Sequence, residues 1–147
     1  MIRLARKEDL EAIAKIDAKA FQKGNWSLEN YYNEFENNPF STLIVFEKEY
    51  IVGFVDYWAT FEIGDITRVA VLPDFQGQKI ASDLLSFALS ELKNKGCECC
   101  HLEVRVSNKR ALSIYDKLGF KVYQKRGNYY ENEEDALLMS KALEEEI

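Results

Sequence analysis

Two polar side chains in the second half of the sequence have the types and spacing that proton transfer requires. Glu103 lies in the run 102–106, in which apolar and polar residues alternate, and Tyr115 lies on the apolar face of the next predicted helix. A carboxylate can accept a proton as a general base, and a phenol can donate one as a general acid. The alternatives are a solvent-exposed strand face for Glu103 and simple core packing for Tyr115.

A second feature could hold an anion. Residues 69–72 form a short apolar run typical of a buried strand, Pro73-Asp74 is a turn signal, and apolar residues at helical spacing follow from Ile80 to Leu92. A helix that starts in this way presents free backbone N–H groups and the positive end of its dipole, which suits a phosphate. Many strand–loop–helix units bind nothing at this point, so the geometry alone leaves both interpretations open.

Three cysteines and the single histidine are crowded into residues 97–101. Three thiolates and an imidazole could form a tetrahedral metal site. Because neighbouring residues on a strand point to opposite faces, we instead predict small structural residues and no metal. We expect no disulfide, since the cytosol is reducing.

The composition limits the class of protein. The chain has 147 residues, of which 47% are hydrophobic and 30% charged, so we expect one soluble domain over residues 1–147. The net charge of -6 argues against nonspecific electrostatic binding to nucleic acid. No run approaches the ~20 apolar residues of a membrane span, and the first residues lack the apolar core of a signal peptide. We therefore predict a cytoplasmic protein with no membrane partner.

The order of predicted elements indicates an α/β fold with a mixed sheet and helices on both faces. A short strand near Ile2 precedes two helices, of which the second is capped by Ser27 and packed by Tyr31, Tyr32 and Phe35. The other predicted elements are strands at 40–46, 51–59, 63–72, 99–106, 120–125 and 136–140, and helices at 82–95 and 108–118.

The loop after residue 72 resembles the coenzyme A loop of the GNAT acetyltransferases. That loop is usually Gln/Arg-x-x-Gly-x-Gly/Ala. Gln76 and Ala81 match it, and Lys79 stands where the family usually has Gly. A Gly there would let the backbone come closer to a pyrophosphate than a residue with a Cβ does.

A second stretch resembles the other signature of GNAT enzymes. It comprises Leu102-Glu103-Val104-Arg105, Ser107-Asn108, Ala111, Tyr115 and Leu118-Gly119-Phe120. Trp26-Ser27, Arg126 and Tyr129-Tyr130 narrow the resemblance to the RimI type, the ribosomal-protein-alanine N-acetyltransferases. The resemblance implies the GNAT fold, with a mixed, mostly antiparallel sheet of six or seven strands.

The resemblance also implies a role for each matching residue. Glu103 would be the base and Tyr115 the acid. Acetyl-CoA would be the co-substrate, held by Val69, Ala70, Val71, Gly77, Gln78, Lys79, Ile80, Ala81, Ser82 and Asn108. Trp26, Tyr129 and Tyr130 would hold the acceptor; the alternative for these aromatic residues is that they anchor loops to the core.

The expected function is transfer of an acetyl group from acetyl-CoA to a protein or peptide N-terminal α-amine, with the N-terminal alanine of a small-subunit ribosomal protein as the expected acceptor. Three alternatives stay open at this stage. The acceptor could be a small amine, the domain could bind acetyl-CoA without catalysis, or a different nucleotide could occupy the helix N-terminus.

Overall fold

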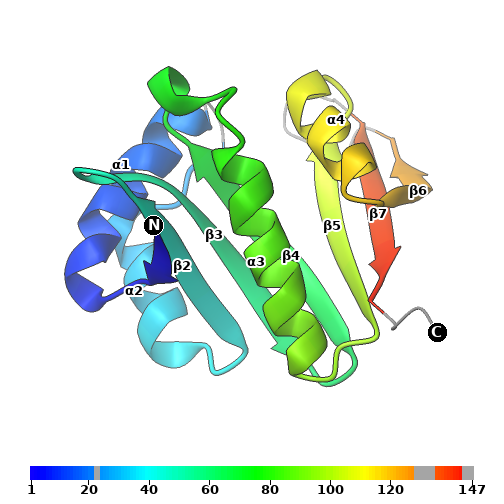
Figure 1. Ribbon diagram of the computed structural model, residues 1–147, viewed down its shortest axis with the longest axis horizontal. Coiled ribbons are helices and arrows are strands. Elements are labelled where there is room, and N and C mark those ends of the chain that lie inside the picture. The colour runs from blue at the N-terminus through cyan, green and yellow to red at the C-terminus, as the bar shows by residue number, and fades with distance from the viewer. Residues whose placement is uncertain (22–23, 128–134, 144–147) are drawn as a thin grey trace.

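Seven strands form one mixed sheet in the computed structural model, which describes residues 1–21, 24–127 and 135–143 (Figure 1). The strands lie in the order β1-β2-β3-β4-β5-β7-β6. Their bounds are Ile2–Leu4 (β1), Ser41–Glu47 (β2), Ile51–Thr60 (β3), Ile63–Val71 (β4), Cys99–Arg105 (β5), Lys121–Arg126 (β6) and Ala136–Ala142 (β7). Among these described strands, only β4 and β5 pair in parallel; every other pair of neighbours is antiparallel. The predicted mixed, mostly antiparallel sheet is confirmed.

Helices cover both faces of this sheet, as predicted. They are α1 (Leu10–Ala20), α2 (Leu28–Asn37), α3 (Ile80–Asn94) and α4 (Lys109–Lys117), with short 3₁₀ turns at Lys7–Asp9 and Pro73–Phe75. In Figure 1, α3 and α4 lie in front of the sheet, and α1 and α2 lie behind it. Each pair of helices buries its own apolar core against the sheet. No helix in the described ranges is both long and apolar enough to cross a membrane.

Short-range signals set the helix ends. The Ser27 hydroxyl accepts the Asn30 N–H (3.1 Å), so the predicted Ser27 cap is confirmed, and the Asn108 side chain accepts the Ala111 N–H (3.2 Å) and caps α4. One packing expectation is wrong: Phe35 is 39% exposed, and Glu34 is buried in its place. Glu34 can be buried because it accepts hydrogen bonds from side chains of the sheet and of the α2 terminus.

The strands β4 and β5 separate part-way along their length. Their register pairs are Ile63↔Cys99, Gly64↔Cys100 and Asp65↔His101, whereas β4 continues to Val71 and β5 to Arg105. The sheet is therefore open between residues 66–71 of β4 and 102–105 of β5 in the part of the chain that the structure describes.

The open edge of β4 presents backbone donors. Leu72 donates its N–H to the Val52 carbonyl of β3 at 2.8 Å. Because N–H groups of an antiparallel strand alternate between its two sides, those of Val69 and Val71 face the side of β5. A group that enters the opening can therefore meet oriented main-chain N–H groups.

Candidate active site

A hollow of about 390 Å³ lies where β4 and β5 separate. It is lined by Trp58, Asp65, Ile66, Thr67, His101, Leu102, Glu103, Tyr123, Arg126 and Leu138. Leu102 and Val104 belong to the core shared with α3 and α4. Since strand neighbours alternate, His101 and Glu103 project to the other face, which is the face that carries α1 and α2. The polar row predicted on this strand thus borders a hollow.

Glu103 is accessible within this hollow. Its side chain is 40% exposed, and its Oε1 lies 3.7 Å from Nη1 of Arg126, a distance at which a partly exposed ion pair is weak. A carboxylate in this setting can bind an ammonium group and accept its proton.

Asp65 is a second carboxylate in the same hollow, and it was not predicted from the sequence. It lies across from His101 in the parallel pairing of β4 and β5. Burial raises the pKa of Asp65, and the neighbouring His101 partly offsets this rise. The pairing of the two strands places it there. The sequence around Asp65 does not distinguish it from a solvent-facing strand residue.

The histidine and two of the cysteines are distributed over both faces of β5. His101 lies 3.2 Å from the Tyr123 hydroxyl through Nδ1 and 3.4 Å from Cys99 Sγ through Nε2. Cys100 points to the opposite face and is fully buried, which raises its pKa to about 12. A buried thiol that stays protonated is a poor nucleophile and a poor metal ligand.

Tyr115 lies on the other side of the sheet from Glu103. It is 6% exposed, it belongs to the core under α3 and α4, and its ring packs edge-on against Phe120 at 5.9 Å. The resemblance to GNAT enzymes implies that Glu103 is the base and Tyr115 the acid. The structure places them on opposite faces of one sheet.

The predicted coenzyme segment borders the opening on the α3 side. Gln76 donates from Nε2 to the Val71 carbonyl (3.1 Å), and this bond ties the loop to the end of β4. Gly77 and Lys79 have φ angles of 85° and 66°, and α3 begins at Ile80, two residues before the predicted start. The first helical hydrogen bond runs from the Asp83 N–H to the Lys79 carbonyl (2.9 Å). The N–H groups of residues 80–82 therefore have no acceptor inside the helix.

Asn108 has a structural role in the described contacts. Its side-chain oxygen caps α4, so a contact with a coenzyme would come from the amide nitrogen. The helix it caps carries Tyr115, and the cap therefore also fixes the start of that helix.

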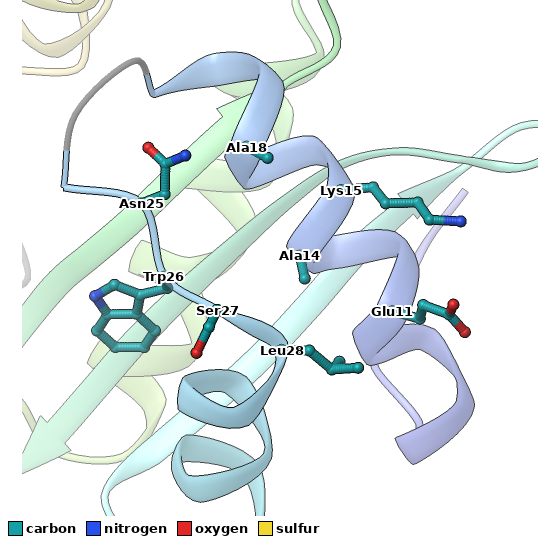
Figure 2. Close-up of a pocket in the computed structure, with 8 residues that line it drawn as sticks. All are labelled: Glu11, Ala14, Lys15, Ala18, Asn25, Trp26, Ser27 and Leu28. Atoms are coloured by element: carbon teal, nitrogen blue, oxygen red, sulfur yellow. The ribbon is translucent and has the colours of Figure 1, made fainter.

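Trp26 lies in the segment between α1 and α2 and does not line the hollow that contains Glu103. It lines a shallow hollow of about 440 Å³ beside α1, and its indole ring points away from that helix (Figure 2). The ring centroid lies 5.2 Å from that of Tyr31 and 5.1 Å from the guanidinium carbon of Arg68. These contacts favour the anchoring alternative for Trp26. Tyr129 and Tyr130 lie outside the described residues.

Comparison with known proteins agrees with this geometry. Residues 10–120 match the acetyltransferase (GNAT) family. A candidate ribosomal protein bS18-alanine N-acetyltransferase of Bacillus subtilis (strain 168) is 34% identical over 94% of this chain and 92% of its own length. An N-alpha-acetyltransferase of Saccharolobus solfataricus is 28% identical over 97% of this chain and 92% of its own length. The crystal structure of the ribosomal-protein-S18-alanine N-acetyltransferase from Escherichia coli superposes with a TM-score of 0.89 at 26% identity, over 100% of this chain and 96% of that one.

Proposed function

The chain belongs to the acetyltransferase (GNAT) family and is an acetyl-CoA-dependent N-acetyltransferase; from this premise we propose that its acceptor is the α-amine of a protein N-terminus. The Bacillus subtilis and Escherichia coli relatives are named for the alanine of ribosomal protein bS18 or S18. We propose the same acceptor class here: the N-terminal alanine of a small-subunit ribosomal protein, acetylated in the cytoplasm.

One observation carries the proposal, namely the opening between β4 and β5. On one face it meets the loop and the N-terminus of α3, and on the other face it meets the hollow with Glu103. A thioester bound from the α3 side can reach an amine that is bound on the opposite face. The coenzyme and the acceptor then approach the reacting carbon from different faces, as direct transfer requires.

The coenzyme is proposed to lie along the open edge of β4. The backbone of Val69, Ala70 and Val71 would bond the pantetheine. The residues 77–82 would surround the pyrophosphate, where the first-turn N–H groups and the dipole of α3 favour negative charge. Asn108 at the start of α4 would contact the coenzyme from the other side of the opening.

The proposed reaction needs no covalent enzyme intermediate. An α-ammonium has a pKa of ~8, so only a weak base is needed to deprotonate it near neutral pH. Glu103 would remove this proton directly or through one water. The neutral amine attacks the thioester carbon, and the oxyanion is stabilised by the Val71 N–H, which faces the opening. The C–S bond then breaks, and the coenzyme thiolate, comparable to a thiol of pKa ~8.5, takes a proton from Tyr115. The attacking nitrogen loses its second proton by way of solvent to the Tyr115 phenolate, so that the amide product and the neutral phenol are formed together.

Mass spectrometry of a panel of acceptors tests this proposal. The panel contains peptides that begin with alanine, the same peptides with a blocked α-amine but a free lysine, and small polyamines. Acetylation confined to the free α-amine supports the proposal. Acetylation of the blocked peptides at lysine would contradict it.

A small-amine acceptor is a second candidate, because Asp65 and Glu103 place two carboxylates in one hollow and could bind a compact cation. Preferential acetylation of the polyamines in the same panel would favour it. Binding of acetyl-CoA without transfer to any member would favour a non-catalytic module.

A further inference from the structure

Arg68 on β4 and Asp17 on α1 form an ion pair beside the proposed acceptor hollow. Nε of Arg68 lies 2.8 Å from Oδ2 of Asp17, and Nη2 lies 3.2 Å from Oδ1. Asp17 is fully buried, and the Arg68 side chain is 14% exposed. The two parallel hydrogen bonds fix the plane of the guanidinium group.

Both partners also hold the α1–α2 segment, by which we mean Phe21 and residues 24–27. The Trp26 N–H donates to Oδ1 of Asp17 (3.1 Å), and Nη2 of Arg68 donates to the Gly24 carbonyl (3.2 Å). The guanidinium carbon lies 4.4 Å from the ring centroid of Phe21 and 5.1 Å from that of Trp26. The segment is therefore attached to β4 through one side chain, by hydrogen bonds and cation–π contacts together.

The place of attachment lies next to the site. Arg68 directly follows Thr67, which lines the hollow, and it belongs to the stretch of β4 that β5 leaves open. Since Asp17 is on α1, the guanidinium lies on the face from which the acceptor is proposed to approach. The α1–α2 segment thus borders the acceptor side of the opening.

We propose that the Arg68–Asp17 pair is a positioning device, which holds the α1–α2 segment as one wall of the acceptor site and so determines the affinity for a peptide acceptor. This inference rests on the proposed function. A buried ion pair contributes little net stability, but it restricts the positions of the residues that it contacts. A segment that is already ordered lowers the entropic cost of peptide binding, because binding does not have to order it.

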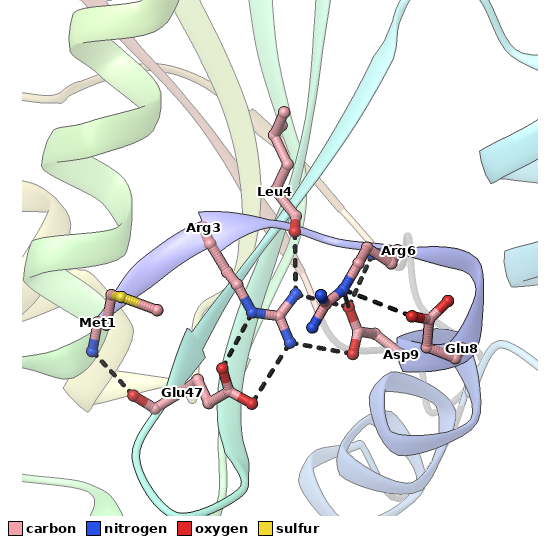
Figure 3. A network of polar contacts seen from close by, with 7 residues as sticks. All are labelled: Met1, Arg3, Leu4, Arg6, Glu8, Asp9 and Glu47. Carbon is pink, nitrogen blue, oxygen red and sulfur yellow. Dashed lines mark hydrogen bonds and ion pairs between the residues drawn. The ribbon is translucent and has the colours of Figure 1, made fainter.

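The alternative is that the pair only stabilises the fold, and the chain offers a matched control for that role. Arg3 makes a similar two-point contact with Asp9, at 2.7 and 3.1 Å, and a further bond to Glu47 at 3.0 Å (Figure 3). Arg3 belongs to the edge strand β1, three strands away from β4. Its removal should lower stability without altering the acceptor site.

The experiment compares Arg68→Met, Arg68→Lys, Asp17→Asn and Arg3→Met in the full chain. Thermal unfolding and the KM values for acetyl-CoA, an alanine-first hexapeptide and alaninamide are measured for each. We expect Arg68→Met and Asp17→Asn to raise the hexapeptide KM at least tenfold and the acetyl-CoA KM less than twofold. Arg68→Lys should show an intermediate effect, because an ammonium cannot make the two-point contact and stacks less well on the rings. The preference for hexapeptide over alaninamide should fall in the same order.

Each result decides the matter. An unchanged hexapeptide KM, or an equal rise in Arg3→Met at matched loss of stability, would overturn the positioning role while leaving the proposed function in place. If the wild type acetylates no peptide, both the function and the inference fail. Should Arg68→Met not fold, Arg68→Lys and Asp17→Asn carry the test by the same criteria.

Discussion

Lys79 adopts a backbone conformation that favours glycine. Its φ is 66°, in the left-handed region, and it is the residue immediately before α3. The GNAT loop usually has Gly at this place, and the structure supplies the physical reason: a Cβ is strained there, whereas Gly is not. The Lys79 side chain is exposed, so its charge can reach solvent or a bound phosphate.

Lys79→Gly is therefore expected to stabilise the fold. Gly relieves the strain of the left-handed conformation, and this gain outweighs the entropic cost of the greater freedom of Gly in the unfolded chain. We expect the free energy of unfolding, measured in urea, to rise by about 1 kcal/mol. If the ammonium pairs with the pyrophosphate, acetyl-CoA binding should weaken most at low salt. Lys79→Ala is the control, since it removes the charge and keeps the Cβ. A loss of stability in Lys79→Gly would contradict this account.

Glu103 and Tyr115 are expected to act in separate steps. Glu103→Gln keeps the shape of the side chain but cannot accept a proton, so kcat should fall about 10²–10⁴-fold and the acidic limb of the pH–rate profile should change. Tyr115→Phe keeps the buried ring and removes the donor to the thiolate, so kcat should fall while acetyl-CoA still binds. Steady-state kinetics across pH and calorimetric titration with acetyl-CoA measure these effects.

The control for this pair is Asp65→Asn, which changes the other carboxylate of the hollow. A larger loss of kcat there than in Glu103→Gln would reassign the base to Asp65. Full activity in both Glu103→Gln and Tyr115→Phe would mean that the proposed mechanism is wrong even though the family is right.

Among the elements, β3 and β4 are joined by a buried polar cluster behind the hollow. Asp56 of β3 is fully buried and accepts hydrogen bonds from Ser41 (2.5 Å) and Thr67 (2.9 Å). Glu34 of α2 faces Asp56 and accepts the Trp58 indole N–H at 2.7 Å. Burial, together with the neighbouring Glu34, raises the pKa of Asp56 to about 8. The two carboxyl groups therefore share one proton near neutral pH.

This shared proton makes stability depend on pH. The pKa of Asp56 is about 8 in the folded protein, against an ordinary value of 3.8, so between these pH values the folded state holds a proton that the unfolded chain has released. Stability should then fall as the pH rises from about 4 to 8. Asp56→Asn mimics the protonated carboxyl and should remove this fall, gaining more than about 1.4 kcal/mol on the wild type between pH 5 and pH 8. Urea unfolding at three pH values measures it.

Ser41→Ala serves as the control, because it removes a hydrogen bond to the cluster without removing a titrating group. It should lower stability by a similar amount at each pH. Parallel stability curves for Asp56→Asn and the wild type would show that Asp56 is ionised in the folded protein.

At the scale of the whole molecule, the two faces of the sheet carry different parts of the proposed site. The α3 and α4 face carries the proposed coenzyme elements, and the other face carries the hollow with the carboxylates. The sheet is continuous from β1 to β4 and from β5 through β7 to β6, and the opening lies at the parallel junction between β4 and β5. A ligand at that junction contacts both halves and should stabilise the folded chain.

Acetyl-CoA is expected to raise the melting temperature. At a ligand concentration one hundred times Kd, the gain in unfolding free energy is about 2.7 kcal/mol. Differential scanning fluorimetry with acetyl-CoA, desulfo-CoA and ATP measures it. Both coenzyme forms should stabilise the protein and ATP much less, because ATP lacks the pantetheine that we propose to pair with the open edge of β4. Equal stabilisation by ATP would contradict the coenzyme site.

Local features of the chain were predictable from the sequence because the interactions that cause them are local. Ser27 and Asn108 cap helices a few residues away, and Gly96 and Gly119 end helices with φ of 95° and 96°. The alternation around Glu103 placed it on the polar face of β5. The coenzyme motif likewise spans a few consecutive residues, so the fold class and the GNAT resemblance could be predicted from the sequence.

Only the tertiary structure decided what lies around these residues. Asp65 joins Glu103 because β4 and β5 pair for three residues and then separate, and Arg68 meets Asp17 across a separation of 51 residues. Glu34 could not be predicted as buried, because its partners Asp56 and Trp58 come from another element. Strand register and the burial of charge depend on contacts between distant segments, and no periodicity in one segment contains that information.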